Sequence, residues 1–162
     1  FKIGENLALT TAGLVGHAQS LARTLAAEVS LFELRRGDSM TVRGAATLTA
    51  NILSGRPHWV QLLIVGVDNE GGSVYSIDSA GGSIPDSYCA TGSGSPYMYG
   101  VLEDGFKENM SRDAAVALAA RALSASAQRD AASGNGMDLA VITAKDGYVS
   151  VEQSEIAAIL KK

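Results

Sequence analysis

In the first third of the chain, the spacing of apolar residues changes from the alternation typical of a strand to the three- or four-residue spacing typical of helices. Residues 6–12 (NLALTTA) alternate apolar residues with small or polar ones, which is typical of a half-buried strand. Residues 15–34 and 41–53 space their apolar positions three or four apart, as amphipathic helices do. Gly37 follows two arginines and predicts the end of the first helix. We therefore expect one strand and then two helices.

The middle of the chain has the pattern of a strand-rich segment. Residues 59–67 (WVQLLIVGV) are almost continuously apolar, which predicts a strand that is buried on both faces. A glycine-rich turn over residues 68–72 leads to a second strand over residues 73–78. A further turn leads to a third strand over residues 83–90.

The last part of the chain returns to helices. Ser95 is a candidate N-cap of a third helix, with Pro96 at its first helical position. Ser111 is a candidate cap of a fourth helix, which is rich in alanine on all sides and is therefore expected to pack between other elements. Residues 137–151 predict a hairpin, and residues 154–160 a short closing helix. This order of elements predicts an α+β fold with layered sheets and helices.

Composition limits the domain count and the class of partner. With 162 residues, of which 46% are hydrophobic and 19% charged, the chain predicts one compact domain over residues 1–162. A net charge of -4 provides no basic field for a phosphate backbone, so we expect no nucleic-acid partner. Residues 59–67 are too short to span a bilayer, so we also expect no membrane partner. Cys89 is the sole cysteine, which fits a reducing compartment, and we expect a cytoplasmic protein.

Several residues could carry chemistry, but each has a simpler structural explanation. His17 and His58 lie at element edges, and no G-x-S-x-G motif exists for a Ser-His-Asp triad. Two histidines and one cysteine match no zinc pattern, so we expect neither a metal nor another cofactor. Residues 92–96 (GSGSP) lack the lysine of a P-loop, which favours a tight turn over an anion site. Cys89 has no neighbour that would lower its pKa and is interpreted as a packed side chain.

The order and spacing of several short motifs are more informative than any one of them. The motifs are TAG at 11–13, AQSL at 18–21, VQLL at 60–63, Asp78 with Gly81 and Gly82, TGSGSP at 91–96, YGVLE at 99–103 and RDAASG at 129–134. Together they resemble the β-subunits of archaeal-type proteasomes over essentially the whole chain. The segments around Ser93 and 129–134 resemble a catalytic β-subunit rather than an α-subunit.

This resemblance implies a fold and a reaction. The family fold is the four-layer αββα sandwich of N-terminal-nucleophile hydrolases, here incomplete at the N-terminus. Its nucleophile is the hydroxyl of an N-terminal threonine, with the free α-amino group as the base. Phe1 resembles a position inside the family domain, so the strands with the threonine, its acidic partner and the catalytic lysine are expected before it. Lys2 falls a few residues downstream of the family lysine and is not given that role.

The resemblance also assigns roles to residues of this chain. Asp130 is implied to orient the terminal threonine and the lysine, and Ser93 and Ser133 to bind the terminal amine. The Gly13 backbone amide is implied to donate to the developing oxyanion. Retention of this set favours an active threonine endopeptidase over the alternative, a non-catalytic β-type subunit with a structural role in the ring.

The substrate pocket is implied by the same resemblance. Thr11 is expected at its floor, Val15 on a wall and Gln19 further out, with Ala12 also binding substrate. None of these residues is charged. A pocket without a fixed charge does not compensate the desolvation of an ionic substrate group, so we expect cleavage after large hydrophobic residues.

The partners implied by the resemblance are other subunits. We expect stacked seven-membered β-rings capped by α-rings, a regulatory ATPase that acts indirectly through the α-ring, and unfolded polypeptides as substrates. Leu31 and Leu34 lie beyond the main apolar face of the first helix, which is consistent with burial between subunits.

Overall fold

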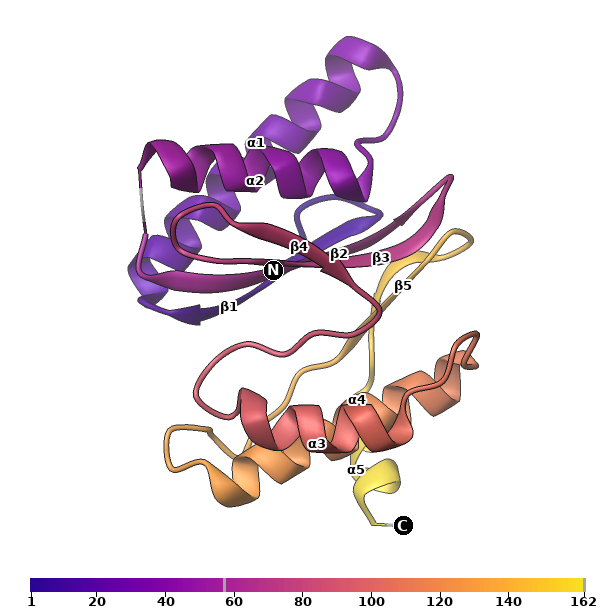
Figure 1. The fold of residues 1–162 in the computed structure, drawn as a ribbon. Coiled ribbons are helices and arrows are strands. Elements are labelled where there is room, and N and C mark those ends of the chain that lie inside the picture. Colours follow the sequence, from indigo (N-terminus) through magenta and orange to yellow (C-terminus); the bar gives the residue numbers. More distant parts are fainter. Residues whose placement is uncertain (57, 162) are drawn as a thin grey trace. The chain divides into compact units, whose positions relative to one another are not determined.

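The computed structural model describes residues 1–56 and 58–161, and these residues form two compact units. The first unit contains residues Phe1–Gly92 and Ile142–Tyr148, and the second contains Ser93–Val141 and Val149–Lys162. Figure 1 shows both units and labels most of their helices and strands. The predicted mixture of helices and antiparallel strands is confirmed, whereas the assignment of residues 1–162 to a single domain stays a prediction.

The first unit is built on a four-stranded antiparallel sheet. Its strands are β1 (Leu7–Gly13), β2 (Val60–Asp68), β3 (Gly71–Ile77) and β4 (Ser83–Asp86), hydrogen-bonded in the order β1-β2-β3-β4. In the register of the first pair, Leu9 lies opposite Ile64 and Gly13 lies opposite Val60. The strand predicted at residues 6–12 is therefore confirmed within one residue at each end.

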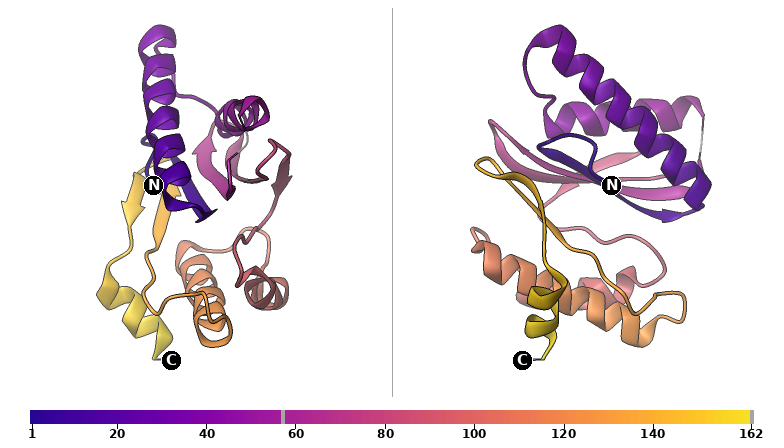
Figure 2. Two further views of the ribbon diagram at one scale, coloured as in Figure 1. Left: turned by 90° about the vertical axis from the view of Figure 1, so that its left-hand side faces the viewer. Right: turned by 180° about the vertical axis from the view of Figure 1, so that it is seen from behind.

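Two helices cover one face of this sheet. They are α1 (Val15–Arg36) and α2 (Val42–Gly55), which lie on the same side of the strands in Figures 1 and 2. Gly37 ends α1 in the left-handed conformation, with its N–H bonded to the carbonyl of Glu33, as its position after two arginines predicts. Thr41 caps α2 by accepting a hydrogen bond from the Gly44 N–H at 3.1 Å.

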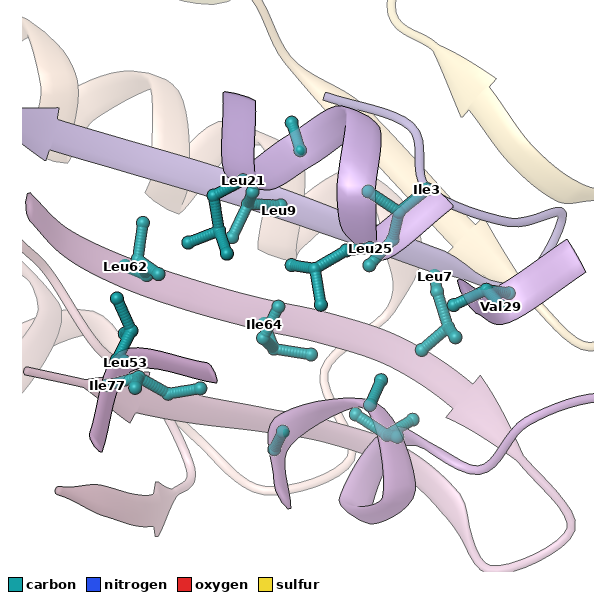
Figure 3. Packing of buried hydrophobic residues seen from close by; sticks show 14 of the residues in the cluster. Ile3, Leu7, Leu9, Leu21, Leu25, Val29, Leu53, Leu62, Ile64 and Ile77 are labelled. Atoms are coloured by element: carbon teal, nitrogen blue, oxygen red, sulfur yellow. The ribbon is translucent and has the colours of Figure 1, made fainter. Parts of the chain in front are cut away.

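The hydrophobic core of the first unit lies between these helices and the sheet. Leu21, Leu25 and Val29 of α1 point toward leucine and isoleucine side chains of β1 and β2 (Figure 3). Leu53 of α2 and Ile77 of β3 extend the same cluster. The apolar residues that follow a helical spacing in α1 and α2 and an alternating spacing in the strands thus pack together in one core, because each element turns its apolar side chains toward it.

The prediction that β2 is buried on both faces is wrong. Leu62 and Ile64 are fully buried, whereas Leu63 and Val65 on the opposite face are only half-buried. Within the first unit, α1 and α2 cover a single face of the sheet, so only alternate residues of β2 reach the core.

The strand predicted at residues 83–90 is also too long. Strand β4 ends at Asp86, and all four of its residues are exposed. It lies at the edge of the sheet, where Pro85 is tolerated because its missing N–H is not needed for a second neighbour.

The second unit is mainly helical. Its helices are α3 (Ser95–Gly105), α4 (Arg112–Arg129) and α5 (Gln153–Leu160). Helix α4 packs against both α3 and α5, which confirms the expectation from its alanine-rich surface. Val116, Val151 and Ile156 form a small core there.

The starts of these helices test two predicted caps. Ser111 caps α4 by accepting a hydrogen bond from the Ala114 N–H at 3.3 Å, as predicted. Ser95 does not cap α3: it is the first helical residue, and Gly94 occupies the N-cap position without a side-chain hydrogen bond. The proline still lies in the first turn, where its missing N–H has no helical partner to lose.

The predicted hairpin is present with shorter strands. Strands β5 (Ala140–Thr143) and β6 (Gly147–Ser150) form a two-stranded sheet. Gly147 has a φ of 63°, which suits a glycine in the turn. No helix among residues 1–56 and 58–161 is both long and apolar enough to cross a membrane.

Candidate active site

The C-terminal end of α4 positions Asp130. The Asp130 N–H donates to the carbonyl of Ser126 at 2.8 Å, which makes Asp130 the residue that caps the helix. The chain then turns back, and the Ser133 N–H donates to the Asp130 carbonyl at 3.1 Å. This turn places the side chain of Ser133 beside the carboxylate of Asp130.

Three residues that the sequence singled out meet at this carboxylate. Ser93 Oγ and Ser133 Oγ each donate to Asp130 Oδ2 at 2.7 Å. The Ala132 N–H donates to the other oxygen, Oδ1, at 3.3 Å. We call Ser93, Asp130 and Ser133 the serine–aspartate cluster. Their assembly in space is an observation, whereas their catalytic roles stay predictions.

The hydrogen bonds of the cluster favour the ionised form of Asp130. The bond from Ser133 has the larger effect and the bond from Ser93 the next, and both hold the pKa of the Asp130 carboxyl below its ordinary value. A negative charge at the C-terminal end of a helix is also opposed by the helix dipole. The negative charge at this position is therefore stabilised by the two serine hydrogen bonds and not by the helix.

Gly94 provides the space in which the cluster forms. A Cβ built on Gly94 would overlap Ser126 Oγ and lie 2.9 Å from Ser133 Oγ. The φ of Gly94 is −83°, which any residue can adopt, so close packing and not backbone conformation requires glycine here.

Sequence analysis missed Ser126, which extends the cluster. Ser126 Oγ lies 2.8 Å from Ser133 Oγ. Nothing in its local pattern indicates this contact, because Ser126 is one of several small residues in an alanine-rich helix and Ser133 follows seven residues later. The negative charge of the cluster also disfavours an anion at residues 92–96, because Ser93 already donates to a carboxylate there.

The predicted oxyanion donor, the backbone amide of Gly13, lies in the first unit. Gly13 ends β1 with a φ of +120°, and a Cβ at this position would collide with the carbonyl oxygen of Trp59. The Leu14 N–H donates to the same oxygen at 2.8 Å. Both conformation and space therefore require glycine at this turn, which holds its backbone in one defined orientation.

The four predicted substrate-binding residues surround this turn along the chain. Thr11 and Ala12 are half-buried residues of β1, and their side chains leave the strand on opposite faces because they are adjacent. Val15 and Gln19 lie one turn apart on α1, and both are exposed. The roles of these four residues in substrate binding stay predictions.

Gln61, to which sequence analysis assigned no role at the site, contacts the start of the segment 92–96. The Gly92 N–H donates to Gln61 Oε1 of β2 at 3.3 Å. A Cβ on Gly92 would lie 3.3 Å from the Cβ of Ala12, and the φ of Gly92 is +95°. The glycine thus allows residue 92 to approach β1 closely.

The structure also describes the surroundings of His17, His58, Cys89 and Lys2. His17 and His58 contact each other edge to face, with ring centroids 5.1 Å apart, and the Trp59 N–H donates to His17 Nδ1 at 3.2 Å. Burial is the main cause that raises the pKa of the Cys89 thiol, which makes it a poorer nucleophile. Lys2 forms an ion pair with Glu5 at 2.6 Å. Within the described part of the chain, no group of three or more His, Cys, Asp or Glu side chains could hold a metal ion.

Comparison with known proteins identifies the family. The sequence profile of proteasome subunits matches residues 1–142. This chain belongs to the proteasome subunit family. Family membership confirms the resemblance described above and the expected α+β fold class.

Curated relatives in archaea support the same assignment. The proteasome subunit beta of Methanobrevibacter ruminantium is 46% identical over 162 residues, which is 100% of this chain and 78% of the relative. The proteasome subunit beta of Thermoplasma acidophilum is 47% identical over 165 residues, covering 100% of this chain and 78% of the relative. That of Ferroglobus placidus is 48% identical over 166 residues, covering 100% and 79%.

Proposed function

We propose that this chain is part of a proteasome β-subunit that acts as a threonine-type endopeptidase on unfolded polypeptides. The observation that carries the proposal is the pair of 2.7 Å hydrogen bonds from Ser93 and Ser133 to one oxygen of Asp130. The names of the β-subunit relatives and the family match support it. The nucleophile in this proposal is the N-terminal threonine implied by the resemblance, which is not among the 162 residues.

Both hydroxyl protons of the serine–aspartate cluster are already donated to Asp130, which favours a positively charged partner. Each serine has one hydroxyl proton, and both protons are directed to Asp130 Oδ2. The side chains of the cluster then have only lone pairs left to offer. A set of acceptors around a carboxylate suits an ammonium group, such as a terminal amine or a lysine.

The proposed reaction is acyl transfer to a threonine hydroxyl. The hydroxyl oxygen attacks the peptide carbonyl carbon while the terminal amine takes the hydroxyl proton. The C–N bond then breaks, and that proton passes to the departing amine. Water hydrolyses the resulting ester and restores the threonine hydroxyl.

Residues of this chain would serve that reaction in two ways. The serine–aspartate cluster holds the amine and the lysine in position, and its negative charge stabilises their protonated forms. The Gly13 N–H donates to the oxygen that becomes negative in the tetrahedral intermediate. No metal or other cofactor is required by this scheme.

The test compares two matched carboxylate variants in the full-length protein assembled with its partner subunits. Asp130→Asn keeps the shape of the side chain and removes its charge, so turnover of a fluorogenic peptide should fall by about 100-fold or more. Asp104→Asn, an exposed position in α3, is the control and should retain turnover. Assembly of both variants is checked by native mass spectrometry.

The outcomes separate an enzyme from a structural subunit. Loss of turnover confined to Asp130→Asn supports a catalytic subunit. Equal turnover of Asp130→Asn and wild type would mean that the cluster does not serve the reaction. An intact wild-type particle with no activity from this subunit would favour the alternative, a non-catalytic β-type subunit with a structural role in the ring.

We also propose stacked seven-membered β-rings capped by α-rings in the cytoplasm, with a regulatory ATPase acting through the α-ring. Leu34 is 85% exposed and Leu31 is 38% exposed on α1, which leaves apolar surface for a neighbouring subunit. Native mass spectrometry with the cognate α-subunit should show particles of four rings. A stable monomer at micromolar concentration under these conditions would contradict this assembly.

A further inference from the structure

Ser126 is a buried polar residue whose hydroxyl serves another side chain. It is 5% exposed, and the other buried polar side chain among the described residues belongs to Thr49. Thr49 Oγ1 donates to the carbonyl of Ala45 one turn earlier at 2.7 Å, which is the usual solution for a hydroxyl inside a helix. Ser126 Oγ instead lies 2.8 Å from Ser133 Oγ, seven residues further along the chain.

The direction of this hydrogen bond follows from the available protons. Geometry alone allows either oxygen to be the donor. Ser133 has a single hydroxyl proton, and this proton is directed to Asp130 Oδ2 at 2.7 Å. Ser126 must therefore donate to Ser133, which gives a chain of donors from Ser126 to Ser133 to the carboxylate.

Such a chain fixes the hydroxyl of Ser133. The hydrogen bond that Ser133 donates to Asp130 sets the rotation of this hydroxyl about its C–O bond, and a hydrogen bond accepted from Ser126 restricts that rotation further. Here the proton is engaged by Asp130 and one lone pair by Ser126, so the remaining lone pair has a defined direction. Accepting one hydrogen bond also strengthens the bond that Ser133 donates.

Gly94 shows that the space for the Ser126 hydroxyl is specific. A Cβ on Gly94 would overlap Ser126 Oγ, so a residue with a side chain could not occupy position 94 while Ser126 keeps this conformation. The first turn of α3 and the last turn of α4 are thus packed around this hydroxyl.

We propose that Ser126 is a positioning residue for the endopeptidase, which orients the Ser133 hydroxyl so that its free lone pair accepts from the amine of the nucleophile. The role rests on the function proposed above. Ser126 does not contact the reacting atoms in this scheme and acts only through Ser133.

The experiment measures kcat and KM of assembled full-length particles that carry Ser126→Ala, Ser133→Ala or both. Removing one hydrogen bond should lower kcat of Ser126→Ala by about threefold to tenfold, with KM changed by less than about twofold. Alanine is a strong helix former and α4 is rich in it, so the variant should fold and assemble. The matched control is Ser124→Ala, which removes a half-buried hydroxyl of the same helix that accepts from Gln128 Nε2 at 3.2 Å. This control should leave kcat unchanged.

The double variant distinguishes a positioning role from a structural one. If Ser126 acts only through Ser133, the double variant should have the kcat of Ser133→Ala alone. Two losses that multiply, or an unchanged kcat in Ser126→Ala, would overturn the proposal.

Asp130→Asn, measured beside these variants, separates failure of this role from failure of the proposed function. An active wild type that loses turnover in Asp130→Asn but not in Ser126→Ala would refute the positioning role alone. A wild-type particle without activity, or retained turnover in Asp130→Asn, would refute the function and the role together.

Discussion

Replacing Gly94 with alanine tests the packing between α3 and α4 at the serine–aspartate cluster. The new Cβ would overlap Ser126 Oγ and would lie 3.0 Å from Ser126 Cβ and 2.9 Å from Ser133 Oγ. Contacts of this kind in a packed site cost about 1–3 kcal/mol of the free energy of unfolding. Alanine is also a poorer N-cap than glycine. We expect Gly94→Ala to be destabilised by about 2 kcal/mol, with a loss of turnover because both serine hydroxyls must move.

The assay is urea unfolding of the full-length subunit, with peptide hydrolysis measured on the assembled particle. Gly100→Ala is the matched control, because it lies inside the same helix and its Cβ would meet no atom within 4 Å. That control should gain about 0.5–1 kcal/mol from the higher helix propensity of alanine.

A double variant identifies the atom responsible for the strain. Gly94→Ala combined with Ser126→Ala removes the closest overlap but keeps the contact with Ser133 Oγ. It should therefore recover part of the lost stability, with a coupling of about 0.5–3 kcal/mol between the two sites. A Gly94→Ala protein as stable as wild type, or strictly additive effects in the double variant, would refute the packing argument.

Three further predictions concern the turn at Asp78, the turn at Gly13 and the substrate pocket. Asp78 accepts hydrogen bonds from the backbone N–H groups of Gly82 and Ala80, and these bonds lower its pKa. The contribution of Asp78 to stability is therefore present above the pKa of the unfolded state, and it is lost as the pH falls through the pKa of the folded state. The difference in urea midpoint between wild type and Asp78→Asn should be larger at about pH 7 than at about pH 3, and a constant difference would contradict this. Gly13→Ala should lose more than about 1 kcal/mol of unfolding free energy, because the φ of this residue is +120° and a Cβ would collide with the carbonyl oxygen of Trp59. The variant should also lose turnover. Near-wild-type stability in a melting experiment would argue against the strained turn. Assembled particles should hydrolyse peptides ending in Tyr or Leu faster than those ending in Arg or Glu, since Thr11, Val15 and Gln19 carry no charge. Faster cleavage after Arg or Glu would exclude Thr11, Val15 and Gln19 as the dominant pocket wall.

Most helices and strands were predictable because their hydrophobic periods depend on local geometry. The spacing of apolar residues in α1 and α2 follows from backbone periodicity, and the cap at Ser111 follows from the unpaired N–H groups of a first helical turn. The motifs around Ser93 and Asp130 indicated the family, because their order along the chain is itself a property of the sequence.

Side-chain contacts between distant segments could be anticipated only through the resemblance, and one of them was missed altogether. Ser93 and Asp130 are 37 residues apart, and nothing in their local patterns indicates that one donates to the other. Ser126 looked like one more small residue of an alanine-rich helix until Ser133 was seen beside it.

The sequence alone therefore determined the elements, the α+β class and the family, since these depend on local periodicity and on motif order. The tertiary structure decided which face of β2 is fully buried, why position 94 is glycine and which hydroxyl supports Ser133. The physical reason is that burial and side-chain hydrogen bonds depend on what packs against a residue, and the partners here come from other helices and loops of the folded chain.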